Sequence, residues 1–245
     1  MFKNKYEKYS SMLYDETKPS GTSVDGDLEF YKNILLPIEG KVLEAGVGNG
    51  RLLVPFLKYK IDLVGVDKSS EMLKLCKNNL QINNLSCELI CADLKNYLVK
   101  NYFEMIIMPN ASFCLIENRI DAKIILKNFY ESLIHNGQLV LDLIFPVEFV
   151  AGASHEYIHN VKGIKLLVKN YSQTINWIEQ YTINKIQYFI NEEIQEEQNV
   201  KLSWYGVEEF KSILNEIGFK EIEVVLNYNN KKLINLKTVT FICKK

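Results

Sequence analysis

Between residues 41 and 145 the sequence alternates short apolar segments with amphipathic ones, and this alternation constrains the fold more than any other feature. The apolar segments have the length of strands and lack a polar face, which is typical of strands buried on both sides. The predicted strands are KVLEA (41–45), IDLVGVD (61–67), SCELICAD (86–93), YFEMIIMP (102–109) and GQLVLDLIF (137–145), and the predicted helices cover 50–59, 69–83 and 117–134. Strict alternation of this kind predicts a doubly wound α/β fold with a mostly parallel sheet.

The alternation stops between residues 151 and 205. Segments 163–172, 174–185, 186–195 and 198–204 look like successive antiparallel strands joined by polar turns. The acidic run NEEIQEEQ (191–198) is expected to be a solvated strand end or turn. We therefore expect residues 151–205 to be an inserted antiparallel β segment that serves as a lid or as a subunit interface.

The α/β pattern resumes with a predicted helix at 207–218, a strand at 219–228, a polar turn NNKK (229–232) and a last strand at 236–245. The last two strands have no helix between them, so at least one should run antiparallel to the rest. Two helices are predicted near the N-terminus, at 6–15 and 27–35. Residues 1–150 and 206–245 should thus form one core with a seven-stranded sheet.

Composition excludes several classes of partner. With 29 Lys and Arg against 30 Asp and Glu, no net charge favours nucleic acid or an anionic membrane. No segment has the length of a membrane span, so a cytoplasmic protein is expected. The sequence suggests no metal site, because no His, Asp and Glu cluster is visible and no Cys-x-x-Cys pair occurs. The cysteines are expected to be reduced core residues; they are Cys76, Cys87, Cys91, Cys114 and Cys243.

A glycine-rich turn follows the first predicted strand, in VLEAGVGNGRLLVPFL (42–57). Gly46, Gly48 and Gly50 allow backbone N–H groups to approach a ligand at the start of a helix. A dinucleotide fingerprint needs a small residue one position after the last of these glycines, where Arg51 stands. Taken alone, the glycines are equally typical of a tight turn without a ligand.

Two carboxylates end the next strands at the same predicted edge of the sheet. Asp67 is placed to accept hydrogen bonds from both hydroxyls of a ribose, although Asp is also a common helix cap. Ser69 is better placed as that cap. Asp93 is placed to accept a hydrogen bond from an adenine amino group, with the Leu94 backbone N–H beside it, although Asp is also common in turns. Together with the glycines these residues predict a nucleoside site.

The segments VLEAGVGNGRLLVPF, LVGVDKSSEML, LICADL, FEMIIMPNASFCLI and LIHNGQLVLDL resemble the class I S-adenosylmethionine-dependent methyltransferases, in their small-molecule branch. The resemblance covers nearly the whole chain outside the insertion. Where the family has paired glycines before its fifth strand, only Gly137 is kept here. The resemblance implies S-adenosylmethionine as cofactor, S-adenosylhomocysteine as product, and transfer of the methyl group to an N or O atom of a small molecule by in-line displacement.

The resemblance also implies roles for individual residues. Glu44 would lie near the cofactor's amino group, the glycines would accommodate its methionine part, and Met72 would pack near the adenine. The fourth-strand motif would bring Met108 and Asn110 to face the methyl group. Residues 1–40 look like the helical lid of the same branch, with Tyr14 lining the cofactor pocket. The full predicted cofactor set is Tyr14, Glu44, Gly46, Gly48, Gly50, Asp67, Met72, Asp93, Leu94, Met108 and Asn110.

A general base is optional, because a neutral amine needs none and an alcohol or phenol benefits from one. His155 and His159 are the candidates, as a base or as orienting donors, because they follow the fifth strand at the ligand edge. Two alternatives stay open: an NAD-dependent oxidoreductase, and a protein that binds S-adenosylmethionine without catalysis. A monomer or a homodimer is expected.

Overall fold

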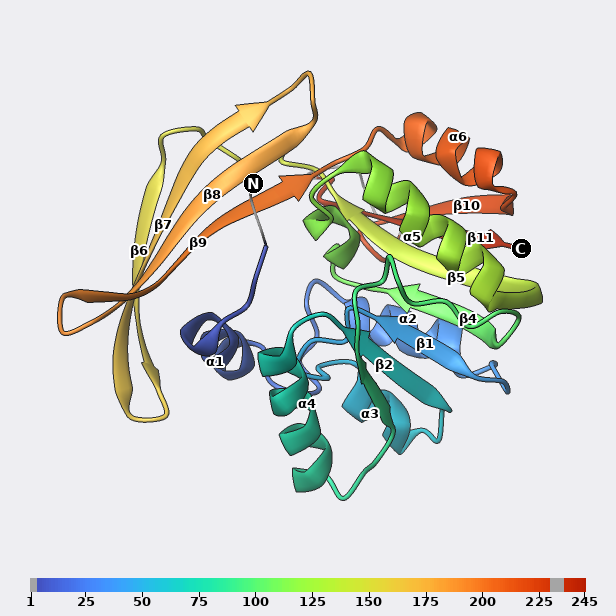
Figure 1. Ribbon diagram of the computed structural model, residues 1–245, viewed down its shortest axis with the longest axis horizontal. Coiled ribbons are helices and arrows are strands. Elements are labelled where there is room, and N and C mark those ends of the chain that lie inside the picture. The colour runs from blue at the N-terminus through green and yellow to red at the C-terminus, as the bar shows by residue number, and fades with distance from the viewer. Residues whose placement is uncertain (1–3, 230–235) are drawn as a thin grey trace.

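The computed structural model describes residues 4–229 and 236–245. Seven strands form one sheet in the order β10-β11-β5-β4-β1-β2-β3 (Figure 1). Strands β1 to β5 run parallel, and β11 is antiparallel to both β5 and β10, as the missing final helix predicts. The strands are β1 (Val42–Ala45), β2 (Leu63–Asp67), β3 (Glu88–Cys91), β4 (Phe103–Met108), β5 (Leu133–Ile144), β10 (Lys220–Leu226) and β11 (Thr238–Lys244). The doubly wound fold with an inserted antiparallel segment is confirmed.

Helices cover both faces of this sheet because alternate residues of each strand point to opposite faces. Leu43 of β1 packs in the core beneath α5 and α6, whereas the neighbouring Val42 packs beneath α2, α3 and α4. Ser69 caps α4 by accepting a hydrogen bond from the Met72 backbone N–H at 3.3 Å, as predicted. The helices are α2 (Asp27–Leu35), α3 (Leu53–Lys58), α4 (Ser70–Ile82), α5 (Arg119–Ser132) and α6 (Val207–Ile217), with a 3-10 turn, η1 (Ser112–Leu115), after β4.

The insertion forms a separate four-stranded antiparallel sheet in the order β6-β7-β8-β9. Its strands are β6 (Ser154–Val161), β7 (Ile164–Asn176), β8 (Tyr181–Ile190) and β9 (Glu193–Ser203). The predicted boundaries were wrong at 174–185 and 186–195, where the chain turns at residues 177–180 and 191–192, and β6 was not predicted. Because Trp177 is apolar, the sequence pattern did not indicate a turn there. Its ring packs edge-on against the Trp204 ring, with the ring centroids 5.5 Å apart.

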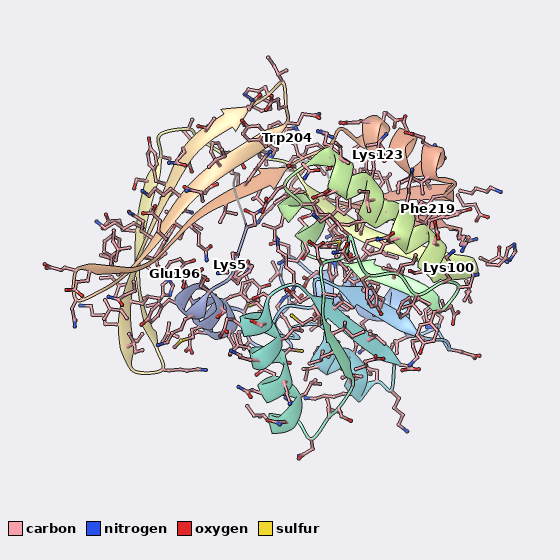
Figure 2. All side chains as sticks on the ribbon, in the orientation of Figure 1. Lys5, Lys100, Lys123, Glu196, Trp204 and Phe219 are labelled. Atoms are coloured by element: carbon pink, nitrogen blue, oxygen red, sulfur yellow. The ribbon has the colours of Figure 1, made fainter. Side chains whose placement is uncertain are left out.

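Helix α1 (Lys8–Thr17) lies between the two sheets (Figure 1). Tyr9 and Leu13 pack against Leu166, Val168 and Tyr188 of the four-stranded sheet. The acidic run 191–198 is not wholly solvated, because Glu196 is only 5% exposed and lies beside the start of α1 (Figure 2). That part of the prediction was wrong, because one face of β9 is covered by α1.

Three further expectations concern the rest of the chain. The five cysteines are free; Cys76, Cys114 and Cys243 are buried, but Cys91 is exposed and so is no core residue. No helix within residues 4–229 and 236–245 has the length and apolar character needed to span a membrane. The predicted turn NNKK begins at Asn229, and its residues 230–232 lie outside the described residues.

The glycine turn and α4 pack so closely that Gly50 admits no side chain. Its φ is +78°, and an added Cβ would lie 2.7 Å from the Cys76 sulfur. Gly163 has a similar φ of +81° but open space around it. We predict that Gly163→Ala lowers the free energy of unfolding by about 1 kcal/mol, the cost of left-handed backbone. Gly50→Ala should cost about 3 kcal/mol, because the steric clash adds to that strain.

Urea denaturation of the two variants at equal protein concentration measures the difference. Equal losses of stability would show that α4 moves aside and that the close packing carries no energetic cost.

Candidate cofactor and methyl-transfer site

The glycine turn is held against β2 by its backbone. The N–H groups of Gly46 and Val47 both donate to the Val66 carbonyl, at 2.8 and 3.1 Å. Gly46, Gly48 and Gly50 all have positive φ, which only glycine adopts without strain. A Cβ on Gly46 would lie 3.2 Å from the Ser112 Cβ. The space between the turn and Ser112 would therefore be filled by any side chain at position 46. This is the close backbone approach that the sequence predicted for a ligand.

Glu44 supplies a buried carboxylate directly before the turn. It is 3% exposed, and its Oε2 atom is buried without a hydrogen-bond partner among the described residues. Burial raises the pKa of this carboxyl to about 8, and the Arg51 guanidinium opposes that rise. An unpartnered buried acceptor fits a cationic group, because an ammonium would supply both the missing donor and the missing charge. The amino group of S-adenosylmethionine meets this requirement.

Asp67, at the end of β2, lies beside the glycine turn and contacts its backbone. Its carboxylate accepts hydrogen bonds from the N–H groups of Gly48 at 2.9 Å and Ser69 at 2.8 Å. Burial raises its pKa, while these two backbone bonds act in the opposite direction. Each carboxylate oxygen has a second acceptor position, so the fixed carboxylate fits the ribose hydroxyls that the sequence assigned to it.

Two methionines line the turn from either side. The Met72 methyl carbon would lie 3.1 Å from a Cβ on Gly48, and that of Met108 would lie 4.0 Å from one on Gly46. Both side chains are 3% exposed. Asp93 and Leu94 follow β3 and are half-buried. Asp93 accepts a hydrogen bond from the Lys95 backbone N–H at 2.9 Å, which also fits a turn-forming Asp.

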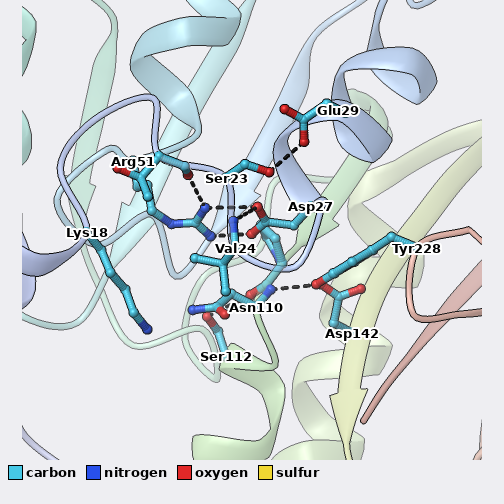
Figure 3. Close-up of polar contacts among 12 residues, drawn as sticks. Lys18, Ser23, Val24, Asp27, Glu29, Arg51, Asn110, Ser112, Asp142 and Tyr228 are labelled. Carbon is cyan, nitrogen blue, oxygen red and sulfur yellow. Dashed lines mark hydrogen bonds and ion pairs between the residues drawn. The ribbon is translucent and has the colours of Figure 1, made fainter. Parts of the chain in front are cut away.

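Asn110 joins the turn after β4 to the N-terminal helix. Its side-chain amide lies 3.5 Å from the Tyr14 hydroxyl, and both residues are half-buried. Asn110 and Ala111 both have φ of 53°, so two successive residues are in the left-handed region. Strain of this kind persists only where neighbours hold the backbone in place. Asp142 does so here, because its Oδ2 accepts the Asn110 backbone N–H at 2.8 Å (Figure 3).

Asp142 is itself part of a buried network that the sequence did not reveal. It is fully buried and also accepts hydrogen bonds from the Tyr228 hydroxyl at 2.8 Å and the Thr240 hydroxyl at 2.6 Å. Burial raises the pKa of Asp142 to about 6 in spite of these donors. In the sequence Asp142 stands within an apolar strand, and only an isolated charge in a strand buried on both faces could have pointed to it.

Arg51 forms a buried ion pair that the sequence also did not reveal. Its guanidinium donates to both carboxylate oxygens of Asp27 at the start of α2, at 3.0 and 2.5 Å, and to the Thr22 carbonyl at 2.7 Å (Figure 3). The side chains of Arg51 and Asp27 are 5% and 0% exposed. The residue that departs from the dinucleotide fingerprint therefore joins the N-terminal segment to the glycine turn.

The structure gathers most of the predicted cofactor residues along one edge but leaves the two candidate histidines apart. His155 and His159 lie on β6, the edge strand at the far side of the four-stranded sheet (Figure 1). His155 is exposed and stacks on Tyr157, with ring centroids 6.3 Å apart. In residues 4–229 and 236–245, no three His, Cys, Asp or Glu side chains are grouped so as to hold a metal ion.

Comparison with known proteins identifies a domain family in part of the chain. Residues 42–137, which include the glycine turn, Asp67 and Asn110, match the model of a methyltransferase domain family. A carboxy-S-adenosyl-L-methionine synthase from Nautilia profundicola is 26% identical over 216 residues, covering 83% of this chain and 79% of that protein.

Two solved structures are similar over nearly their whole length. An S-adenosylmethionine-dependent methyltransferase from Clostridium acetobutylicum has a TM-score of 0.77 at 19% identity, covering 95% of this chain and 96% of its own. The S-adenosylmethionine-bound amino pentose methyltransferase CalS10 from Micromonospora echinaspora has a TM-score of 0.71 at 16% identity, covering 100% and 99%. Residues 42–137 therefore match a methyltransferase domain, and the whole chain shares the fold of these S-adenosylmethionine-dependent enzymes.

The raised pKa of Glu44 predicts that cofactor binding releases a proton. At pH 7 a carboxyl with a pKa of about 8 is mostly protonated, and pairing with the ligand's ammonium lowers that pKa. Affinity for S-adenosylhomocysteine should therefore rise between pH 6 and pH 8. Calorimetry at pH 7 in buffers of different ionisation enthalpy should show release of about one proton. Glu44→Gln should abolish this release; release that persists in the variant would assign the proton to another group.

The raised pKa of Asp142 predicts a pH dependence of stability with the opposite sign to that of an ordinary ion pair. The folded protein holds this proton more tightly than the unfolded chain, whose aspartates titrate near pH 4. The stabilisation is present below that pH and is lost as pH rises through about 6, by on the order of 3 kcal/mol.

Urea denaturation of the wild type and of Asp142→Asn between pH 4 and pH 7 tests this. The variant should lose the decline in stability; parallel curves for the two proteins would contradict the assignment.

Proposed function

We propose that the protein transfers the methyl group of S-adenosylmethionine to an amine nitrogen of a small, hydroxyl-rich acceptor. The cofactor supplies a sulfonium methyl group and a thioether leaving group. Glu44, Asp67 and the glycine turn would hold it, and Asn110 and Tyr14 would border the position of the methyl group. The five free cysteines support a reducing, cytoplasmic setting.

The observation that carries the choice of nitrogen is the lack of a free base beside Asn110 among the described residues. The side chains there are the Asn110 amide and the hydroxyls of Tyr14 and Ser112, none of which takes up a proton at neutral pH. The nearest carboxylate, Asp142, is fully buried and already accepts the Asn110 N–H and two hydroxyls. All three histidines lie on strands β5 and β6, and none belongs to this cluster. A neutral amine attacks through its own lone pair and needs no base in the transition state, whereas a hydroxyl acceptor benefits from one.

The choice of a hydroxyl-rich acceptor is supported by the face of the four-stranded sheet that α1 covers. Leu166 and Val168 of this face pack on α1, and Asn170 and Ser172 continue the same face along β7. The Asn184 amide of the adjoining strand donates to Asn170 at 3.0 Å and to Ser172 at 3.3 Å. Amides and hydroxyls suit an uncharged polyol. The similarity to a methyltransferase of amino pentoses points the same way.

The protein's own contribution to the reaction would be approach geometry and exclusion of water. Tyr14 comes from α1, which packs between the cofactor edge and the four-stranded sheet. Asn110 is fixed by its backbone bond to Asp142. Residues 1–40 would thus serve as the lid, and β6 to β9 would form the acceptor-binding sheet. His155 and His159 would at most orient the acceptor at the outer rim of that sheet.

We predict S-adenosylhomocysteine formation with aminosugars, and none with the matching sugars that carry a hydroxyl in place of the amine. Mass spectrometry of the product should show one added methylene mass, located on nitrogen. Turnover of the hydroxyl sugar instead of the amine would contradict the nitrogen assignment, and turnover of neither would contradict the acceptor class.

Asp67→Ala provides the control for cofactor binding. It should weaken S-adenosylhomocysteine binding by about 1 to 3 kcal/mol, because the ribose hydroxyls lose a charged partner. Asp62→Ala is the matched variant, since Asp62 lies just before β2 in an exposed ion pair with Lys41 and should leave binding unchanged. Binding of NAD in preference to S-adenosylhomocysteine would overturn the cofactor site itself.

A further inference from the structure

Glu196 is a buried carboxylate whose partners are backbone groups of another element. Its Oε2 accepts hydrogen bonds from the N–H groups of Tyr9 at 2.7 Å and Ser10 at 3.1 Å. Its Oε1 accepts one from the Gln198 side chain at 2.8 Å. Within the described residues it forms no ion pair with a lysine or arginine, although it is only 5% exposed. Its hydrogen bonds therefore come from the start of α1 and from Gln198.

Helix α1 gains from this partner because its first turn has no acidic residue and the side chain of its N-cap residue, Glu7, makes no cap hydrogen bond. The Glu7 backbone N–H itself donates to the Ser10 hydroxyl at 2.9 Å. The first N–H groups of a helix lack partners within the helix and carry a partial positive charge. Tyr9 and Ser10 are the second and third residues of α1, so Glu196 bonds the two N–H groups that a capping side chain normally satisfies. The cap of α1 thus comes from β9, about 186 positions along the chain.

The other end of α1 reaches the glycine turn. Asp15 accepts hydrogen bonds from the side-chain amides of Asn49 at 2.9 Å and Asn79 at 3.0 Å. Asn49 also donates to the Lys18 carbonyl, where α1 ends, at 3.0 Å. Tyr14 faces Asn110 on the same helical turn as Asp15. One short helix therefore joins the four-stranded sheet at its start to the cofactor edge at its end.

We infer that Glu196 is a positioning residue for cofactor binding, which acts by capping α1 and so holds Tyr14 and Asp15 against the cofactor edge. It touches neither cofactor nor acceptor in this role. The inference rests on the cofactor site proposed above at the glycine turn. It makes the four-stranded sheet a structural determinant of cofactor affinity, since a residue of β9 stabilises the lid that covers the opposite sheet.

Three variants test this inference. Glu196→Ala removes the cap, and Glu196→Gln keeps an acceptor oxygen in the same place. Glu197→Ala is the matched control, because the adjacent Glu197 is exposed on the other face of β9, where it contacts Lys185 and Gln187. The readouts are the S-adenosylhomocysteine dissociation constant by calorimetry, hydrogen exchange of α1 amides, and Tm.

We expect Glu196→Ala to weaken S-adenosylhomocysteine binding by about tenfold, the ratio that corresponds to losing a helix cap. Amides of α1 should exchange faster in this variant. Glu196→Gln should stay within about threefold of the wild type, and Glu197→Ala should be unchanged.

Two outcomes would overturn the inference. One is equal affinity for Glu196→Ala and Glu197→Ala, including the case in which Tm falls while affinity holds, since Glu196 would then only stabilise the fold. The other is a loss of affinity with α1 exchange unchanged. The measurement needs no acceptor, so a failure of the proposed acceptor class leaves it intact, and a wild type that does not bind S-adenosylhomocysteine refutes the cofactor site instead.

Discussion

The buried ion pair between Arg51 and Asp27 determines how the N-terminal segment meets the rest of the molecule. Two charges removed from water are tolerated only when each satisfies the other, and here the guanidinium donates to both carboxylate oxygens. Because Arg51 follows the glycine turn and Asp27 begins α2, the pair fixes α2 and the chain before it over the cofactor edge. The position of Tyr14 beside Asn110 depends on this attachment.

The core could be predicted from the sequence because its pattern is local. Strands β1, β2 and β4 are buried on nearly every residue, and the helices between the strands carry one apolar face each, so periodicity separates strands from helices. The periodicity of the insertion is weaker. Its strands are half-buried, and Trp177 and Ile178 place apolar side chains in a turn, where the pairing of Trp177 with Trp204 could be seen only in three dimensions.

The same distinction applies to the site. Gly46, Gly48, Gly50 and Asp67 lie within one strand-turn-helix unit and the strand beside it, so their proximity follows from topology. Asp142, Glu196 and Asp15 act across 32 to 187 positions of sequence. Asp142 and Glu196 accept backbone N–H groups, which every residue except proline provides, and Asp15 accepts the side-chain amides of two asparagines. Contacts of this kind produce no recognisable pattern in the sequence. Glu196 lies in an acidic run that resembles a solvated turn, so its buried position was not predicted.

The network around Asp142 includes two residues from the C-terminal part of the chain. Strand β11 lies between β5 and β10, and Thr240 and Tyr228 bring two hydroxyls from this C-terminal region to the carboxylate that holds Asn110. A chain shortened before Tyr228 would lose more than the interior strand β11. It would also lose two of the donors that hold the Asp142 carboxylate beneath Asn110, so Tyr228 and Thr240 help to fix the turn after β4 although they lie far from it in the sequence.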